Sequence, residues 1–235
     1  MLLAELGDAV VNGESAQKAL HVMRRYEEAD RAAINAEFDS FLEGIAITKG
    51  SSRRGLIVGE MNELTRTQYG YSLSLRQSAR KYYGSTELIA HAEKTFPYAW
   101  RALGDRSARV VAILLVERTP KGHLRLVDLA AMLCSNTFIP CDSIHEVALA
   151  NRLVAEHRAF DKPMRIAKGD DMLPDFELTD TAQRCHIEVY GMNGVAAYEA
   201  RKEAKRELRR LRAIPAVEWD VDMLPLASVT LPPAR

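Results

Sequence analysis

The chain has 235 residues, of which 47% are hydrophobic and 27% are charged, as is usual for a globular protein. Its 32 basic residues are balanced by 32 acidic ones, which excludes a general electrostatic attraction to polyanions. Any affinity for nucleic acid must therefore come from a local cationic patch.

The three cysteines are an odd number and have no CxxC spacing, which argues against a disulfide framework or a zinc knuckle and for a reducing compartment. The first residues lack the basic region and long apolar core of a signal peptide. The longest apolar run, 110–116, is too short to span a bilayer. We therefore expect a cytoplasmic protein with no membrane segment.

The first part of the chain, residues 1–138, predicts an α+β accessory domain. Apolar residues at helical spacing predict a long helix over 15–42, and this helix could serve as the arm of a homodimer. The remaining elements that we expect are short strands at 56–61 and 71–75, a helix over 85–103 that is interrupted or kinked at Pro97, and a long hairpin formed by 109–118 and 124–133.

The order of elements changes after Pro140. The pattern predicts a helix, three strands, a helix and a strand, at 143–160, 163–166, 176–178, 186–190, 198–212 and 216–221. A tail with three prolines follows at 224–235. The fold class is therefore α/β: residues 139–235 form a domain with a mixed sheet flanked by helices.

Two carboxylates lie in neighbouring strands of this second domain. Asp175 follows Pro174 at the start of one strand, and Glu188 lies between Ile187 and Val189 in the next. A hairpin can bring the two acids together at a sheet edge, where they repel each other unless a cation or proton lies between them. Mg²⁺, or Mn²⁺ in its place, suits such oxygen ligands. The alternative is a turn aspartate and an exposed strand glutamate with no common role.

A third acid, Glu146, lies in the first turn of the helix expected at 143–160. It could reach the acid pair as a further or water-mediated metal ligand. The alternative is structural, because Ser143 and Glu146 have the spacing of a capping box, in which the two residues satisfy free backbone groups at the helix start.

The helix at 198–212 is strongly basic. Residues 201–212 hold seven basic and two acidic side chains, a net charge of plus five. This charge predicts phosphate contacts from the arginines and stabilisation of developing negative charge by one of two lysines. The arginines are Arg201, Arg206, Arg209 and Arg210, and the lysines are Lys202 and Lys205. The alternative is a solvated surface helix, because several acid–base pairs have i,i+3 spacing.

With these residues identified, the segment 143–222 resembles the PD-(D/E)XK nuclease superfamily, whose common core has the same order of elements. Pro174-Asp175 resembles the PD motif, Glu188 the second acid and Glu146 the acid of the first helix. The resemblance implies a restriction-endonuclease-like core and a metal-dependent nuclease that cleaves DNA. The chain departs from the pattern at Tyr190, which replaces the usual lysine, and Lys202 or Lys205 is then the substitute.

A wider segment, about 56–222, resembles a family of uncharacterised proteins carried on conjugative plasmids and integrative elements. The resemblance lies in the long hairpin and in the runs that begin at Tyr69, Pro174, Glu188 and Tyr198. This resemblance implies a mobile-element context without a chemistry. Two alternatives to the enzyme stay open: a catalytically inactive nuclease-like module that binds nucleic acid or protein, and a structural subunit of a larger complex.

Overall fold

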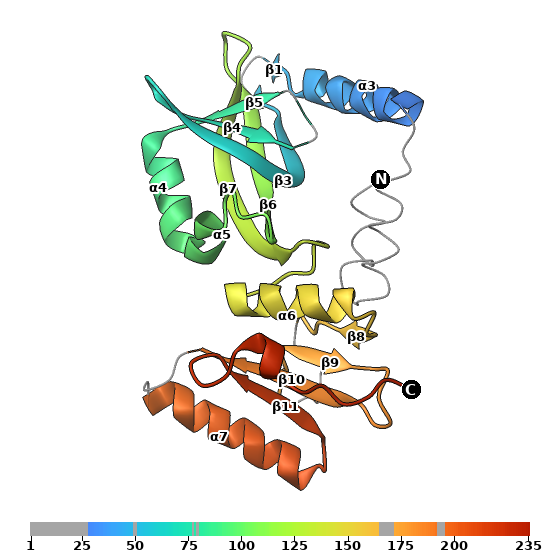
Figure 1. Ribbon diagram of the computed structural model, residues 1–235. Coiled ribbons are helices and arrows are strands. Elements are labelled where there is room, and N and C mark those ends of the chain that lie inside the picture. Colours follow the sequence, from blue (N-terminus) through green and yellow to red (C-terminus); the bar gives the residue numbers. More distant parts are fainter. Residues whose placement is uncertain (1–27, 49–50, 77, 79, 165–171, 192–195) are drawn as a thin grey trace. The chain divides into compact units, whose positions relative to one another are not determined.

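The computed structural model describes residues 28–48, 51–76, 78, 80–164, 172–191 and 196–235 (Figure 1). The chain divides into two compact units. Within the described residues, the first unit ends at Asp142 and the second begins at Ser143. Of the long helix expected at 15–42, only the part from Glu28 lies within the described residues, as helix α3 (Glu28–Gly44).

The first unit is built on a closed five-stranded barrel with the strand order β3-β4-β5-β7-β6. Strands β5 and β7 pair in parallel, and the other neighbours pair antiparallel. The bounds are β3 (Arg54–Thr67), β4 (Gly70–Leu75), β5 (Lys81–Gly84), β6 (Ala108–Arg118) and β7 (Leu124–Ser135). A small ladder, β1 (Ile47–Thr48) with β2 (Ser51–Ser52), precedes the barrel.

Strand β3 is long enough to close the barrel because it has two different partners. Its first half pairs with β6 up to Glu60, and its second half pairs with β4 from Met61 onward, with a bulge between Met61 and Glu63. A bulge bends a strand and increases its twist, as barrel closure requires. The core is filled by alternate residues of the strands, including Leu73, Val110, Ala112, Leu114 and Leu126.

Two helices connect β5 to β6 in this unit. Ser85 caps α4 (Thr86–Thr95), since its hydroxyl accepts a hydrogen bond from the Leu88 N–H at 3.2 Å. Pro97 is the first residue of α5 (Pro97–Arg101). Of the two expectations at Pro97, the structure shows the interruption: the proline begins a second helix, because it has no N–H to continue the hydrogen-bond ladder of the first.

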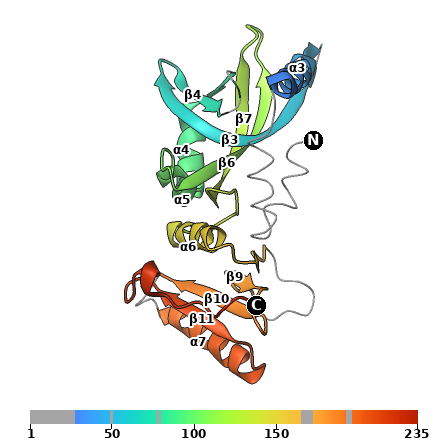
Figure 2. The same cartoon turned by 45° about the vertical axis from the view of Figure 1, so that its right-hand side comes forward.

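The second unit has a four-stranded sheet with the order β11-β10-β9-β8 (Figures 1 and 2). Strands β8, β9 and β10 are antiparallel neighbours, and β11 is parallel to β10. The bounds are α6 (Ile144–Ala155), β8 (Phe160–Asp161), β9 (Phe176–Leu178), β10 (Cys185–Tyr190), α7 (Ala196–Leu211), β11 (Ala216–Asp220) and the 3-10 helix η1 (Leu226–Ser228).

Helices α6 and α7 cover opposite faces of this sheet. Trp219 of β11 packs edge-on against His145 of α6, whereas Glu188 of β10 contacts α7. The expectation of a mixed sheet flanked by helices is therefore confirmed. The strand expected at 163–166 is wrong in position, because the structure has this strand as β8 (Phe160–Asp161). Residues 163 and 164 have no regular secondary structure, and 165 and 166 lie outside the described residues.

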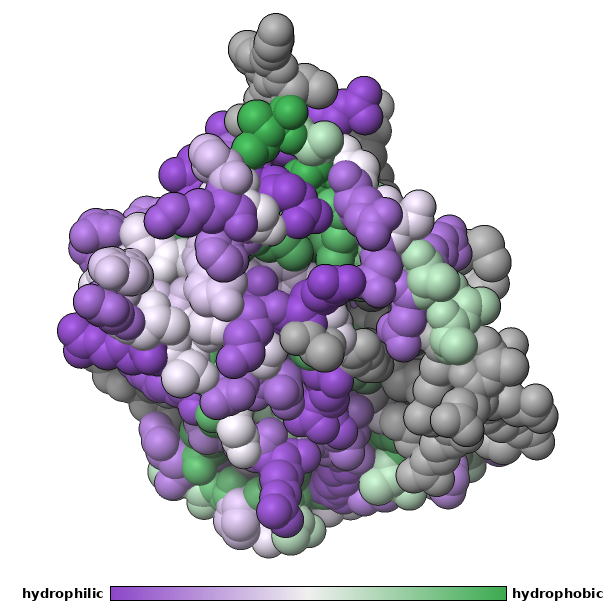
Figure 3. Space-filling view, turned by 90° about the horizontal axis from the view of Figure 1, so that it is seen from above, coloured by the Kyte–Doolittle hydropathy of each residue, from purple (hydrophilic) through white to green (hydrophobic). Residues whose placement is uncertain are grey.

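The apolar residues of both units lie mainly inside. Phe160 and Phe176 are fully buried, with ring centroids 5.8 Å apart in an edge-on contact. In the space-filling view, hydrophilic side chains cover most of the visible face (Figure 3). Within the described part of the chain, no helix has both the length and the apolar character needed to cross a membrane.

Candidate functional site

The hairpin of β9 and β10 brings Asp175 and Glu188 together. Phe176 is paired with Ile187, so the next position along each strand places Asp175 opposite Glu188. The Asp175 Oδ2 atom accepts a hydrogen bond from the Val189 N–H at 2.7 Å. The turn between the strands thus sets the alignment of the two acids, since register in a hairpin follows from its pairing.

The environment of Asp175 raises the pKa of its carboxyl group. Burial is the largest cause, and the negative charge of Glu188 raises the pKa further. The Val189 N–H and the cations Lys162 and Lys205 act in the opposite direction without cancelling the effect. A carboxylate that is ionised at a cost to the folded state is typical of sites that hold a proton or a cation.

Glu188 is buried, with 1% of its surface exposed, and each of its oxygens has a cationic partner. Lys205 Nζ lies 2.8 Å from Oε2, and Arg209 Nη1 lies 2.8 Å from Oε1. Both cations come from α7, which covers this face of the sheet. Such pairing is required, because a buried carboxylate without a partner would cost several kcal/mol.

Of the two lysines expected near the acid pair, Lys205 reaches it and Lys202 has different contacts. Lys205 Nζ also donates to the Leu173 carbonyl at 2.8 Å, which holds it beside the segment that leads through Asp175 into β9. Lys202 Nζ lies 4.3 Å from the ring centroid of Tyr190 and 3.5 Å from Asp220. The spacing of three residues along α7 places the two ammonium groups in different surroundings.

Tyr190, which the resemblance to the nuclease superfamily aligns with a lysine, takes part in a separate network. Its hydroxyl accepts from Arg209 at 3.2 Å and donates to Glu218 at 3.3 Å. Burial raises the pKa of the phenol above its ordinary value, so the group stays protonated. Tyr190 therefore stabilises the contact between β10 and α7.

Ser143 caps the helix that carries Glu146, as the spacing predicts, whereas the Glu146 carboxylate bonds the Ser143 hydroxyl and Lys162. The Ser143 hydroxyl accepts from the Glu146 N–H at 3.1 Å and caps α6. The Glu146 carboxylate lies 2.6 Å from Lys162 Nζ, and both side chains are buried. Lys162 also lies 4.6 Å from the ring centroid of Phe176 and acts electrostatically on Asp175. This role of Lys162 could not be predicted from the sequence, because no motif or periodicity distinguishes a lysine between Asp161 and Pro163.

The arginines of α7 differ in exposure. Arg209 is 3% exposed and pairs with Glu188 and Glu218, so the expectation that it binds phosphate on the surface is corrected: its guanidinium faces the sheet. Arg206 is paired with Glu218 and Glu203, and Arg210 is paired with Glu207. Two of the expected i,i+3 pairs are therefore present. Arg201 is exposed and makes no ion pair with the residues that the structure describes.

The residues expected to hold a metal do not form a three-carboxylate set. Within the described residues, no group of three or more histidine, cysteine or acidic side chains is arranged to hold an ion. Glu146 is engaged by Ser143 and Lys162, which corrects its expected role as a ligand. Asp175 and Glu188 still fit Mg²⁺ in number and type, because this ion commonly takes one or two carboxylates and keeps several waters.

The fold and the site define a mixed α/β protein, in which a barrel unit precedes a helix-flanked sheet with a buried acid pair. A model of the family DUF1173, described as a protein of unknown function, matches residues 2–221. The chain belongs to this family. No match was found among the curated proteins or among the solved structures.

Proposed function

We propose that the unit beginning at Ser143 is a metal-dependent nuclease domain that cleaves DNA phosphodiester bonds, in the context of a mobile element. The observation that carries the proposal is the meeting of Asp175, directly before β9, with Glu188 of β10 and Lys205 of α7. The order α6, β8, β9, β10, α7, β11 also agrees with the common core of the PD-(D/E)XK superfamily.

Asp175 and Glu188, with the Val189 carbonyl, would hold Mg²⁺ or Mn²⁺. A divalent ion there supplies a bound water of lowered pKa and offsets negative charge on the phosphate. The elevated pKa of Asp175 supports this assignment, because a nearby positive charge would relieve the cost of ionising the carboxyl group.

Lys205 is the proposed substitute for the lysine that Tyr190 replaces. The Leu173 carbonyl and Glu188 hold its ammonium group beside the acid pair, where it can donate to a phosphate oxygen. Arg201 and Arg210 on the exposed side of α7, together with Arg206, which is exposed at the border of the sheet while it pairs with Glu218, would contact the DNA backbone. Such contacts position a strand without reading its sequence.

The barrel unit supports a nucleic-acid substrate by analogy of fold. Oligonucleotide-binding folds are five-stranded barrels that bind through the face of their second and third strands and through neighbouring loops. The corresponding strands here are β4 and β5. Lys81 and Tyr83 are exposed on β5, and the Tyr83 ring lies 5.6 Å from the ring of His123 in the β6–β7 turn. Aromatic rings beside cations are suited to stacking unpaired bases.

A second candidate function is a catalytically inactive module that binds nucleic acid or protein. The observation that favours it is the complete pairing of Glu188, whose oxygens are both bonded to cations at 2.8 Å. A metal would have to compete with Lys205 for Oε2. If it does not, the same residues serve as a buried structural network.

The test is cleavage of labelled single- and double-stranded DNA with Mg²⁺ or Mn²⁺, using Asp175→Asn and, as a matched control, Glu177→Gln. Glu177 is a carboxylate two residues further along, within β9, where it pairs with Arg184 and lies opposite His186 of β10. The proposal expects cleavage by the wild type and the control and none by Asp175→Asn. Equal cleavage by all three proteins would rule out this active site.

Calorimetry with Mn²⁺ separates the two candidates if no cleavage is seen. A folded protein that binds DNA but takes up no Mn²⁺ supports the inactive module. Uptake of Mn²⁺ that is lost in Asp175→Asn supports a metal site and directs the search to other nucleic-acid substrates.

A further inference from the structure

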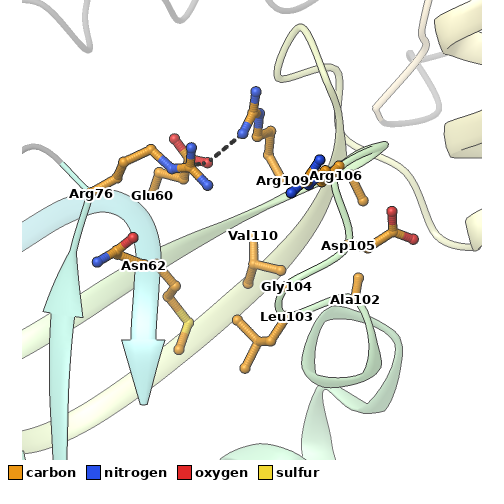
Figure 4. A pocket seen from close by; sticks show the side chains of 12 residues that line it. Glu60, Asn62, Arg76, Ala102, Leu103, Gly104, Asp105, Arg106, Arg109 and Val110 are labelled. Carbon is orange, nitrogen blue, oxygen red and sulfur yellow. Dashed lines mark hydrogen bonds and ion pairs between the residues drawn. The ribbon is translucent and has the colours of Figure 1, made fainter. Parts of the chain in front are cut away.

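A pocket of about 460 Å³ lies in the barrel unit, at the point where β3 exchanges its partner β6 for β4 (Figure 4). Its walls come from the middle of β3, the end of β4, the loop after α5 and the start of β6. The volume is within the range of small-molecule sites. The bulge between Met61 and Glu63 is beside it, and bulges are frequent next to functional sites.

The pocket has an excess of cations. Three arginines line it, Arg76, Arg106 and Arg109, against the two acids Glu60 and Asp105. Both acids already have partners. Glu60 forms ion pairs with Arg76 at 2.9 Å and with Arg109 at 3.2 Å. Asp105 accepts hydrogen bonds from the N–H and the hydroxyl of Ser107 at 2.8 Å each. Three positive side chains against two negative ones leave a net charge of plus one in the pocket.

Two arginines of the pocket have donors that the described residues do not satisfy. The Nε atom of Arg109 is buried without a hydrogen-bond partner. Arg106 is exposed and forms no ion pair within the described part of the chain. A buried donor without a partner is costly, so an acceptor that reached it would be stabilising.

Another part of the lining is apolar. It is formed by Met61, Leu103 and Val110, and Asn62 adds an amide group (Figure 4). A ligand that fits both parts of the lining carries an anionic group next to a flat or apolar body. Arginine favours phosphate, because its planar guanidinium can donate two parallel hydrogen bonds.

We propose that this pocket binds a nucleoside monophosphate group, with the phosphate at Arg106 and Arg109 and the nucleoside against Leu103 and Val110. A free mononucleotide and the phosphorylated 5′ end of a nucleic-acid strand share this chemistry. The proposal depends on the barrel unit alone and does not depend on catalysis by the acid pair.

The experiment is isothermal titration calorimetry of the full chain without divalent metal, with four probes. They are inorganic phosphate, dAMP, a short 5′-phosphorylated oligonucleotide and the same oligonucleotide with a 5′ hydroxyl. The proposal expects binding of dAMP or of the 5′-phosphorylated strand in clear preference to the 5′-hydroxyl strand. Binding of dAMP identifies a free nucleotide as sufficient, whereas binding of the phosphorylated strand alone identifies a strand end.

Arg106→Ala should weaken the binding roughly tenfold or more, because it removes a charge-assisted contact of about 1.5–3 kcal/mol. Arg101→Ala is the matched control, since it removes the same charge from α5 at an exposed position over the Tyr98 ring, outside the pocket. Arg109→Lys keeps a cation for Glu60 while removing the unpartnered Nε, and it should also weaken binding.

Three results would overturn the proposal. The first is no binding of dAMP and none of the phosphorylated strand. The second is equal affinity for the two oligonucleotides. The third is an equal effect of Arg106→Ala and Arg101→Ala, with circular dichroism showing that both variants are folded.

Discussion

At the scale of single residues, the second unit is dominated by buried charge. Glu188, Arg209 and Lys202 are all almost inaccessible, which is rare unless each has a partner. Arg209 links Glu188, Glu218 and the Tyr190 hydroxyl across β10 and β11. The network fixes how α7 lies on the sheet, and hence where Lys205 is placed.

Arg209→Met should therefore destabilise the protein by about 3–5 kcal/mol, the usual result of removing one partner from a buried ion pair. Urea unfolding followed by circular dichroism measures the change. Arg210→Met is the control on the same helix, and it should change the stability far less because its ion pair with Glu207 is exposed to solvent. Similar losses in both variants would contradict the structural role of Arg209.

Asp175→Asn should make the folded state more stable at neutral pH. The folded environment raises the pKa of Asp175 above its unfolded value of about 3.9, so ionisation opposes folding as the pH rises through the folded pKa. Asparagine has no such charge and can still accept from the Val189 N–H. The gain should shrink as the pH is lowered from the raised folded pKa toward the unfolded value, and it should be lost once the pH is below about 4.

Thermal unfolding of the wild type and Asp175→Asn between pH 4 and pH 8 tests this sign. Glu177→Gln is again the comparison. A variant that is less stable than the wild type at neutral pH, by more than the control, would show that the carboxylate stabilises the fold.

At the scale of elements, local signals and long-range pairing contribute differently. The starts of α4 and α6 follow from capping serines, and the bounds of α7, β6, β7, β10 and β11 agree closely with the periodicity of the sequence. Strand β8 was misplaced because α6 ends at Ala155, after which His157 has a positive φ of 55° and the chain turns back toward β9. Two residues carry too little pattern to predict a strand.

Ser143→Ala and Ser85→Ala should each cost about 1 kcal/mol, within the usual range of 0.5–2 kcal/mol for a lost helix cap. The first change removes the acceptor for the Glu146 N–H, and the second removes the acceptor for the Leu88 N–H. Because the caps belong to different units, the losses should add in the double variant. Calorimetric unfolding of the three variants measures both effects, and a loss that is not additive would indicate coupling.

At the scale of the whole molecule, the zero net charge means that any DNA binding depends on local patches. Arg201→Ala should weaken DNA binding for all sequences alike and reduce the slope of log affinity against log salt by about one. Fluorescence anisotropy between 50 and 200 mM salt measures this slope. Arg184→Ala, which removes an exposed cation from the loop before β10, is the control and should leave the slope unchanged. An unchanged slope in Arg201→Ala would remove α7 from the proposed interface.

The homodimer expected through the N-terminal helix stays a prediction, because the helix is described only from Glu28. Light scattering at two protein concentrations tests it. A mass that stays at 26.3 kDa over a tenfold range would contradict a dimer.

The sequence by itself determined the elements whose signals are local: the helix caps, the alternating strands, and the hairpin that aligns Asp175 with Glu188. Only the tertiary structure decided that β3 closes a barrel, that Lys205 rather than Lys202 reaches the acid pair, that Arg209 is buried, and that Lys162 forms an ion pair with Glu146. These depend on which face of each element is covered by a distant segment, and periodicity shows that a face is apolar without showing what covers it. The arginine pocket has the same origin, since its walls are brought together from four separate segments by barrel closure.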